Sequence, residues 1–228
     1  MTEENLIEKN WSRIKDLIIK ANGNLKAIKV IPVTKTVGIA EITVLKNLGF
    51  DCFAENRIDA LKEKLNHFVL SNLKWDFIGN IQSRKIPEIL TYSHFIHSVG
   101  NSEIISKINT CAKNAKKIAD VLLQINIAEE PQKSGFSADE IKLNFSNYLK
   151  LENIRIKGLM TMAPQTDNVA IIRKTFGNLR KLRDLLKNEA YSDFRELSMG
   201  MSNDFEIATQ EGATILRIGS SFFKEFKK

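Results

Sequence analysis

Apolar positions along the chain follow two alternating patterns. Short runs rich in β-branched residues, such as AIKVIPVTK at 27–35, indicate strands that are covered on both faces, because buried parallel strands show little polar alternation. Between these runs lie longer segments whose apolar residues recur at steps of three and four, as Ile7, Trp11, Ile14 and Ile18 do. That spacing is typical of amphipathic helices. The chain therefore predicts a repeated strand–helix order.

The pattern predicts eight such units after one extra N-terminal helix. The expected strands are 27–35, 51–56, 74–79, 94–99, 120–128, 154–160, 195–200 and 213–219. The expected helices are 4–21, 39–48, one from Ile58 through Phe68, 82–90, 101–116, 138–150, 168–188, 203–211 and a short final segment at 222–228.

This order predicts an α/β fold, a single (β/α)8 TIM barrel with an extra N-terminal helix. Parallel strands need a crossover between them, and each expected connection contains a helix. The length of 228 residues suits one barrel, so we expect residues 1–228 to form a single domain. The alternative is an open doubly wound sheet, which would have to discard two or three of these strands.

Composition indicates a soluble protein of the cytoplasm. The chain is 43% hydrophobic and 27% charged, and it has no apolar run of the roughly 18 residues that a membrane span needs. Its acidic N-terminus does not resemble a secretory signal. Two cysteines, Cys52 and Cys111, exclude a disulfide framework, and we expect both to be buried or half-buried thiols.

A net charge of +7 permits an anionic partner. The basic residues are scattered along helices, however, and aromatic residues do not interleave with them as a platform for bases requires. We therefore expect no nucleic-acid binding, whereas a small phosphorylated ligand suits the charge.

Two loops are candidates for a phosphate site. Active sites of these barrels lie at the C-terminal ends of the strands, and phosphates commonly bind after the seventh and eighth. Those loops read SMGMSND and IGSS, in which Ser202, Gly219 and Ser220 offer hydroxyls, amides and a close backbone approach. Ser202 could instead cap the helix 203–211. The neighbouring Gly219-Ser220 pair favours phosphate.

Lys35 ends the first expected strand, and Arg217 lies on the eighth. In a closed barrel these strands are neighbours, so the two cations would flank one pocket beside the phosphate loops. A lysine at a strand end is usually only solvated. A lysine facing a phosphate site indicates instead a Schiff base with a phosphorylated aldehyde.

Other polar residues give weaker signals. His67, His94 and His97 lack the spacing of metal ligands, so no metal site is expected. Glu55 suits a salt bridge better than a general acid, and Asn56 suits a ligand contact or a loop turn equally.

Seven segments together resemble one known family, the YggS/PROSC family of pyridoxal-phosphate-binding proteins, also called PLP homeostasis proteins. Its fold is similar to the N-terminal barrel domain of alanine racemase. The segments, which run in order over nearly the whole chain, are VTKT at 33–36, FAEN at 53–56, WDFIGNIQSRK at 75–85, FIHSV at 95–99, KSGF at 133–136, GLMTM at 158–162 and LSMGMSNDFEIATQEGATILRIGSSFF at 197–223.

The resemblance implies the cofactor pyridoxal 5′-phosphate (PLP), bound as a Schiff base to Lys35. It also implies that Asn56 lines the pocket and that Arg217 lies near the pyridine nitrogen. Phosphate contacts are implied for Ser202, Gly219 and Ser220.

Two positions depart from the family pattern. Asp76 stands where a histidine is usual, which leaves the pocket edge near the third strand open. Ser220 replaces a threonine and keeps the hydroxyl, so phosphate binding should persist.

The resemblance implies a role in PLP homeostasis with little or no catalytic turnover. A protonated arginine beside the ring nitrogen makes the cofactor a weak electron sink. Racemases of this fold also need a tyrosine from a second domain, which we do not find here, and Tyr92, Tyr148 and Tyr191 are expected away from the barrel mouth. The alternatives are a PLP-dependent amino-acid racemase and a PLP-free Schiff-base aldolase.

The implied partner is PLP itself. We expect a monomer that makes only transient contacts with PLP-dependent enzymes.

Overall fold

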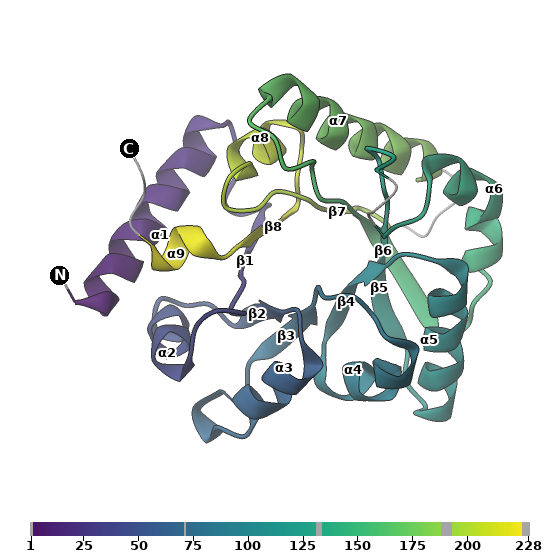
Figure 1. Ribbon diagram of the computed structural model, residues 1–228, viewed down its shortest axis with the longest axis horizontal. Helices are drawn as coiled ribbons and strands as arrows, with labels where there is room; N and C mark the ends of the chain where they lie inside the picture. The colour runs from purple at the N-terminus through teal and green to yellow at the C-terminus, as the bar shows by residue number, and fades with distance from the viewer. Residues whose placement is uncertain (1, 71, 131–133, 188–192, 225–228) are drawn as a thin grey trace.

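The computed structural model describes residues 2–70, 72–130, 134–187 and 193–224, which form a ring of parallel strands surrounded by helices (Figure 1). The strands are β1 (Lys29–Pro32), β2 (Cys52–Glu55), β3 (Lys74–Phe77), β4 (Phe95–Val99), β5 (Ala119–Gln124), β6 (Ile154–Met160), β7 (Glu196–Ser198) and β8 (Ile215–Ile218). The helices are α1 (Glu3–Lys20), α2 (Ile39–Asn47), α3 (Ile58–Leu65), α4 (Ile86–Tyr92), α5 (Ser102–Asn114), α6 (Ala138–Tyr148), α7 (Val169–Leu186), α8 (Phe205–Gln210) and α9 (Ser220–Phe223), with short 3-10 turns η1 (Phe68–Leu70) and η2 (Ser83–Lys85).

The strands form one parallel sheet in the order β1-β8-β7-β6-β5-β4-β3-β2. The two outer strands meet again through a parallel bridge between Val33 and Ala54 and a 3.0 Å hydrogen bond from the Thr34 amide to the Ala54 carbonyl. The sheet is therefore a nearly closed barrel, which confirms the predicted fold class.

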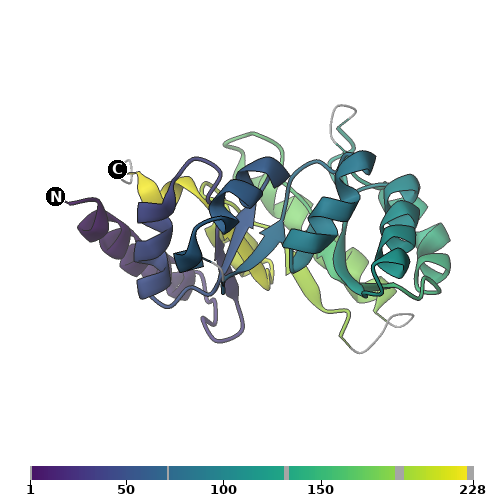
Figure 2. The ribbon, with the colours of Figure 1, turned by 90° about the horizontal axis from the view of Figure 1, so that it is seen from below.

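Helices cover the outside of the barrel on all sides (Figures 1 and 2). Their apolar stripes point inward, as in α1, where Ile7, Ile14 and Ile18 are fully buried. The helical spacing read from the sequence is thus the packing surface of each helix.

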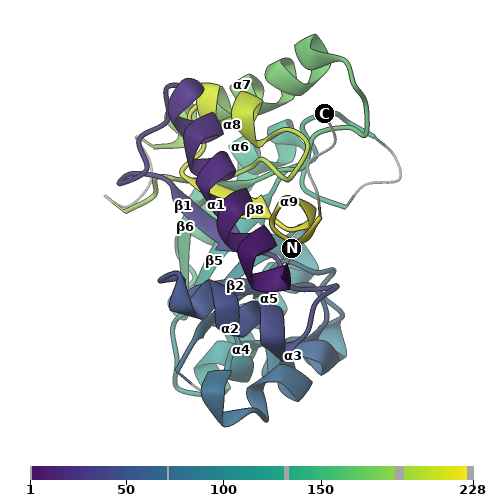
Figure 3. The ribbon, with the colours of Figure 1, turned by 90° about the vertical axis from the view of Figure 1, so that its left-hand side faces the viewer.

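The extra helix α1 lies beside the short C-terminal helix α9 (Figure 3). Asn10 donates hydrogen bonds to the Phe222 and Lys224 carbonyls, and the Trp11 ring packs against Phe50 and Phe222. This contact fixes the end of the chain next to the turn that follows β8.

A separate apolar cluster is formed by residues of the strands and by Val33, directly after β1, and fills the inside of the barrel. It consists of Ile31, Val33, Ala54, Phe95, Leu122, Met160 and Ile215. The remaining interior positions include several polar side chains, which is unusual because branched apolar residues dominate the interiors of such barrels.

Most predicted elements are confirmed, with different boundaries. The prediction was wrong for the helix after β2, because α3 ends at Leu65 and η1 follows as a separate turn. It was also wrong for the helix 203–211, which begins at Phe205.

Some expectations fall outside the described residues. These are Lys133 of the KSGF segment, Tyr191, residue 188 at the end of one helix, and 225–228 at the end of the chain.

Along the described stretches, every helix is too short or too polar to span a bilayer. Cys52 is buried and Cys111 is half-buried, as expected.

Candidate functional site

Lys35 lies in a turn directly after the first strand. Two residues earlier, the Val33 amide donates a 2.8 Å hydrogen bond to the Ile218 carbonyl, which pairs the ends of β1 and β8. The Lys35 side chain is exposed, and its ammonium group makes no hydrogen bond or ion pair with another described residue. A primary amine therefore stands accessible at the C-terminal end of the barrel.

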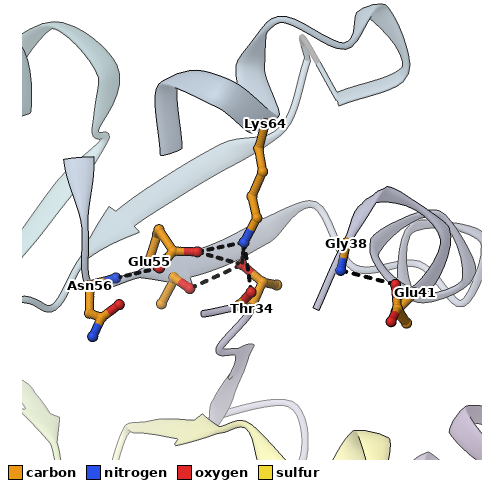
Figure 4. Close-up of polar contacts among 7 residues, drawn as sticks. Thr34, Gly38, Glu41, Glu55, Asn56 and Lys64 are labelled. Atoms are coloured by element: carbon orange, nitrogen blue, oxygen red, sulfur yellow. Dashed lines mark hydrogen bonds and ion pairs between the residues drawn. The ribbon is translucent and has the colours of Figure 1, made fainter. Parts of the chain in front are cut away.

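A buried ion pair holds the backbone on which Lys35 sits (Figure 4). Lys64, from α3, places its Nζ 2.6 Å from Glu55 Oε2 and donates to the Thr34 carbonyl at 2.6 Å and to the Thr34 hydroxyl at 3.1 Å. The Lys64 side chain is 10% exposed and that of Glu55 only 1%. This contact links the ends of β1 and β2 immediately before Lys35. It also confirms the salt-bridge interpretation of Glu55.

Asn56 follows the same strand end. Its amide donates a 2.9 Å hydrogen bond to Glu55 Oε1, while its half-buried side chain points away from Lys64 (Figure 4). The next strand end passes very close, since a Cβ built on Gly79 would lie 1.8 Å from the Asn56 carbonyl oxygen. Only glycine fits there, and this contact fixes where the Asn56 backbone lies.

The two candidate phosphate loops meet through Ser202. Its Oγ accepts hydrogen bonds from the Gly219 and Ser221 amides, both at 3.2 Å, and the Ser221 hydroxyl donates to the Ser202 carbonyl. The residue before α8 is Asp204, so Ser202 does not cap that helix. Of the two interpretations left open by the sequence, the helix cap is wrong.

Two neighbours complete this junction. Gly200 has φ +93°, and a Cβ there would lie 2.6 Å from the Ala208 Cβ, so a side chain would push the β7 loop off α8. Ser220 is exposed, and neither its amide nor its hydroxyl bonds to another described residue. These groups can donate to an anion without giving up an existing contact.

Arg217 points into the barrel rather than to the surface. Its Nη1 donates to the Ser198 hydroxyl at 2.6 Å and its Nη2 to the Thr161 carbonyl at 3.0 Å. The side chain is buried, and burial lowers the pKa of Arg217 to about 10, so the guanidinium is still charged at neutral pH. Among the described residues, no carboxylate lies within ion-pair distance of it.

Asp76 is an interior residue and not part of a pocket edge. Its Oδ2 lies 3.3 Å from Lys29 Nζ and 3.3 Å from His97 Nε2, and its Oδ1 is 3.7 Å from His94 Nδ1. Burial alone would raise the pKa of Asp76, but the contacts with His94, His97 and Lys29 hold it well below the usual range. The carboxylate is therefore ionised inside the barrel.

Cys52, on the neighbouring strand, faces the same carboxylate. Burial and the charge of Asp76 raise the pKa of the Cys52 thiol to about 12. The thiol is therefore protonated at neutral pH and is a poor nucleophile.

Four residues of the site were not among the predicted site residues: Lys64, Ser198, Thr161 and Ser221. Lys64 sits in an ordinary helical stripe, and only its position among apolar residues at 58, 61 and 65 signals that it faces inward. Ser198 and Thr161 are polar residues in strand ends that carry no motif.

The described residues hold no group of three or more histidine, cysteine or acidic side chains suited to a metal ion. What the site does offer is an accessible amine, donors at a two-loop junction and a buried guanidinium at one end of a barrel. This set suits a small anionic ligand with an electrophilic carbon.

Comparison with known proteins identifies the class and the family. The family model of the alanine racemase N-terminal domain matches residues 4–225, so the chain has the barrel that this class shares. A pyridoxal phosphate homeostasis protein from Aquifex aeolicus is 34% identical over 215 residues, with 94% of each chain covered. The chain belongs to the family of pyridoxal phosphate homeostasis proteins.

Solved structures show the same likeness. PipY of Synechococcus elongatus without PLP has a TM-score of 0.87 at 26% identity, covering 96% of this chain and 100% of its own. The structure of PipY with PLP bound gives a TM-score of 0.84 at 24% identity, with the same coverage.

Proposed function

We propose that this chain binds PLP reversibly at the C-terminal ends of its strands and serves PLP homeostasis, with Lys35 as the covalent attachment point and little or no turnover. The relatives named for this role match nearly the whole chain. The observation that carries the proposal is the accessible Lys35 amine in the turn after β1, the strand that pairs with β8. The end of β8 contacts Ser202 through the Gly219 amide.

The residues present fit the cofactor. Ser202, Gly219 and Ser220 would hold the phosphate, because they supply hydroxyls and amides at one junction of two loops. Asn56 would line the pocket beside Lys35. When bound, PLP supplies an aldehyde that condenses with a primary amine to a C=N bond, with loss of water.

Arg217 supports a carrier in preference to a racemase. We propose that its guanidinium lies near the ring nitrogen, as the resemblance implies. A guanidinium that stays charged disfavours a proton on a neighbouring nitrogen, and without that proton the ring withdraws electrons weakly. The chain would then hold the cofactor without activating bound amino acids.

We further propose a monomer of the cytoplasm that meets PLP-dependent enzymes transiently. Among the described residues, the most exposed apolar side chains, Leu143, Ile118 and Leu185, lie on α6, in the connection before β5 and on α7. Single exposed apolar residues are normal on a monomer. Light scattering at increasing protein concentration tests the monomer, and a rising mass would contradict it.

Equilibrium dialysis with PLP tests the main proposal. The wild type should bind one PLP per chain, and Lys35→Ala should lose at least tenfold in affinity, a change of roughly 1.4 kcal/mol or more. Lys107→Ala, on the exposed face of α5, is the control and should bind as the wild type does. Equal binding by the Lys35 variant would refute the assignment.

Deuterium exchange at the α-carbon of L- and D-alanine separates the carrier from the racemase. With PLP present, the carrier should show no exchange above that of free PLP. Rapid exchange with inversion would establish the racemase instead.

A further inference from the structure

A chain of four polar side chains crosses the inside of the barrel below the proposed site. It runs from Asp76 on β3 to His97 on β4, then to Ser198 on β7 and Arg217 on β8. Three of these side chains are fully buried and Arg217 is 3% exposed. Buried polar groups are costly unless they are paired, so this arrangement needs a reason.

The proton inventory of these side chains favours one direction for each contact. Arginine can only donate, so the Ser198 oxygen accepts from Arg217 at 2.6 Å. The Ser198 hydroxyl proton has one acceptor within hydrogen-bond distance among the described side chains, His97 Nδ1 at 3.0 Å. That proton is paired only when Nδ1 accepts, which favours the imidazole form that carries its proton on Nε2.

Asp76 is the carboxylate that faces His97 Nε2. Its Oδ2 lies 3.3 Å from His97 Nε2, a distance of electrostatic contact, and Nε2 makes no aligned hydrogen bond to any described residue. Lys29, from β1, and His94, from the connection before β4, face the same carboxylate from the other side. The negative charge of Asp76 therefore favours the Nε2–H tautomer of His97, which is also the form that accepts from Ser198 at Nδ1.

The doubly protonated form of His97 does not fit. Its Nδ1 would then donate to the Ser198 oxygen, placing two cations, His97 and Arg217, on one hydroxyl. Burial is the largest influence and lowers the pKa of His97; Asp76 acts in the opposite direction, and the charges of Arg217 and Lys29 add to the lowering, so the net shift is downward. His97 is therefore neutral inside the barrel.

We propose that Asp76 and His97 are positioning residues for Arg217: they fix the proton on His97 Nε2, which turns the Ser198 lone pairs toward the guanidinium. Arg217 is thereby held by neutral partners, Ser198 and Thr161, with no carboxylate beside it. Its charge then remains available to a ligand at the barrel mouth. That last step rests on the proposed function, whereas the proton assignment does not.

The first test is the tautomer of His97, read by nitrogen-15 NMR of the protein without PLP. The chain has three histidines, and His67→Gln and His94→Gln assign the remaining signal. The wild type should show the Nε2–H form. In Asp76→Asn, the amide can donate to Nε2, so the proton should move to Nδ1, as it does when the aspartate of a Ser-His-Asp triad becomes asparagine. A wild type with the proton on Nδ1 would overturn the proposal.

The second test compares two replacements of His97 in PLP binding. In His97→Asn the amide oxygen takes the place of Nδ1 and still accepts from Ser198, so PLP affinity should stay within about threefold. In His97→Leu that acceptor is gone, and affinity should fall about tenfold. The tenfold figure expresses the expected loss of about one hydrogen bond. His67→Gln, remote and exposed, is the control and should match the wild type.

The outcomes separate the two proposals. If the wild type fails to bind PLP, the proposed function fails and the NMR result still judges the proton assignment. If PLP binds but His97→Leu matches the wild type, or Asp76→Asn leaves the tautomer unchanged, the positioning role is wrong. If Asp76→Asn fails to fold, the tautomer of the wild type and the comparison of His97→Asn with His97→Leu still test the positioning role.

Discussion

Individual side chains set where the backbone of the site lies, and Lys64 is the clearest case. It joins Glu55 to the Thr34 carbonyl, one residue before Lys35. A residue with no place in any motif therefore positions the residue that carries the proposed chemistry. Its position in a helical stripe indicated an inward-facing side chain, but the partner on β2 could not be inferred without the fold.

Lys64→Met should destabilise the protein by about 3–5 kcal/mol, because it leaves the buried Glu55 charge without a partner. Urea unfolding measures this. Lys62→Met on the same helix removes a half-exposed pair with Glu88 and should destabilise the protein much less than Lys64→Met does, because solvent screens such pairs. Similar losses in the two variants would contradict the structural role of Lys64.

Ser202→Ala should weaken PLP binding about tenfold, because the Gly219 and Ser221 amides lose their shared acceptor and the loop junction opens. Pyridoxal, which lacks the phosphate, should bind equally to the variant and the wild type. Ser202→Thr keeps the hydroxyl and is the matched control. Equal losses for both ligands would show that Ser202 does not act on the phosphate end.

At the scale of elements, the alternation of apolar runs and helical stripes predicted the order of all eight strands. It did so because buried parallel strands and amphipathic helices have different apolar periods. Boundaries were less predictable, since hydrogen-bond ladders depend on neighbouring strands. The segment 27–35, for example, pairs as a strand only over Lys29–Pro32.

Gly79→Ala tests how tightly the ends of β2 and β3 are joined. The new methyl group would overlap the Asn56 carbonyl, so we expect a loss of about 1–3 kcal/mol and weaker PLP binding. Gly38→Ala, where a Cβ lies 3.6 Å from its nearest neighbour, should cost under about 1 kcal/mol. A well-tolerated Gly79 variant would mean that this contact is not maintained.

At the scale of the whole molecule, the interior polar chain was the feature least visible in the sequence. Its four residues come from four separate strands, and only closure of the barrel brings them together. They are Asp76, His97, Ser198 and Arg217. The phosphate loops were predictable because the fold class fixes where strand ends meet. The side-chain partners inside the barrel depend on register and cannot be inferred from residue types.

Acid should destabilise the protein in two steps. The pKa of His97 is lowered in the folded state, so as the pH falls this histidine binds a proton in the unfolded chain before it does so in the folded protein. Its contribution is complete above about pH 6.5 and falls below that value, by at most about 1.4 kcal/mol per pH unit. The pKa of Asp76 is also lowered, so its contribution falls further below about pH 4.

Urea unfolding between pH 5 and pH 7.5 measures the first step. The wild type should gain stability as the pH rises to about 7. His97→Asn has no titrating imidazole at this position, so its stability should depend less on pH. Identical profiles would contradict a neutral, buried His97.

The most direct test of the central claim is to find which lysine PLP reaches. Wild-type protein incubated with PLP is reduced with borohydride, digested and mapped by mass spectrometry. We predict one modified site, Lys35. Modification spread over other lysines with Lys35 unmodified, or no modification at all, would contradict the account.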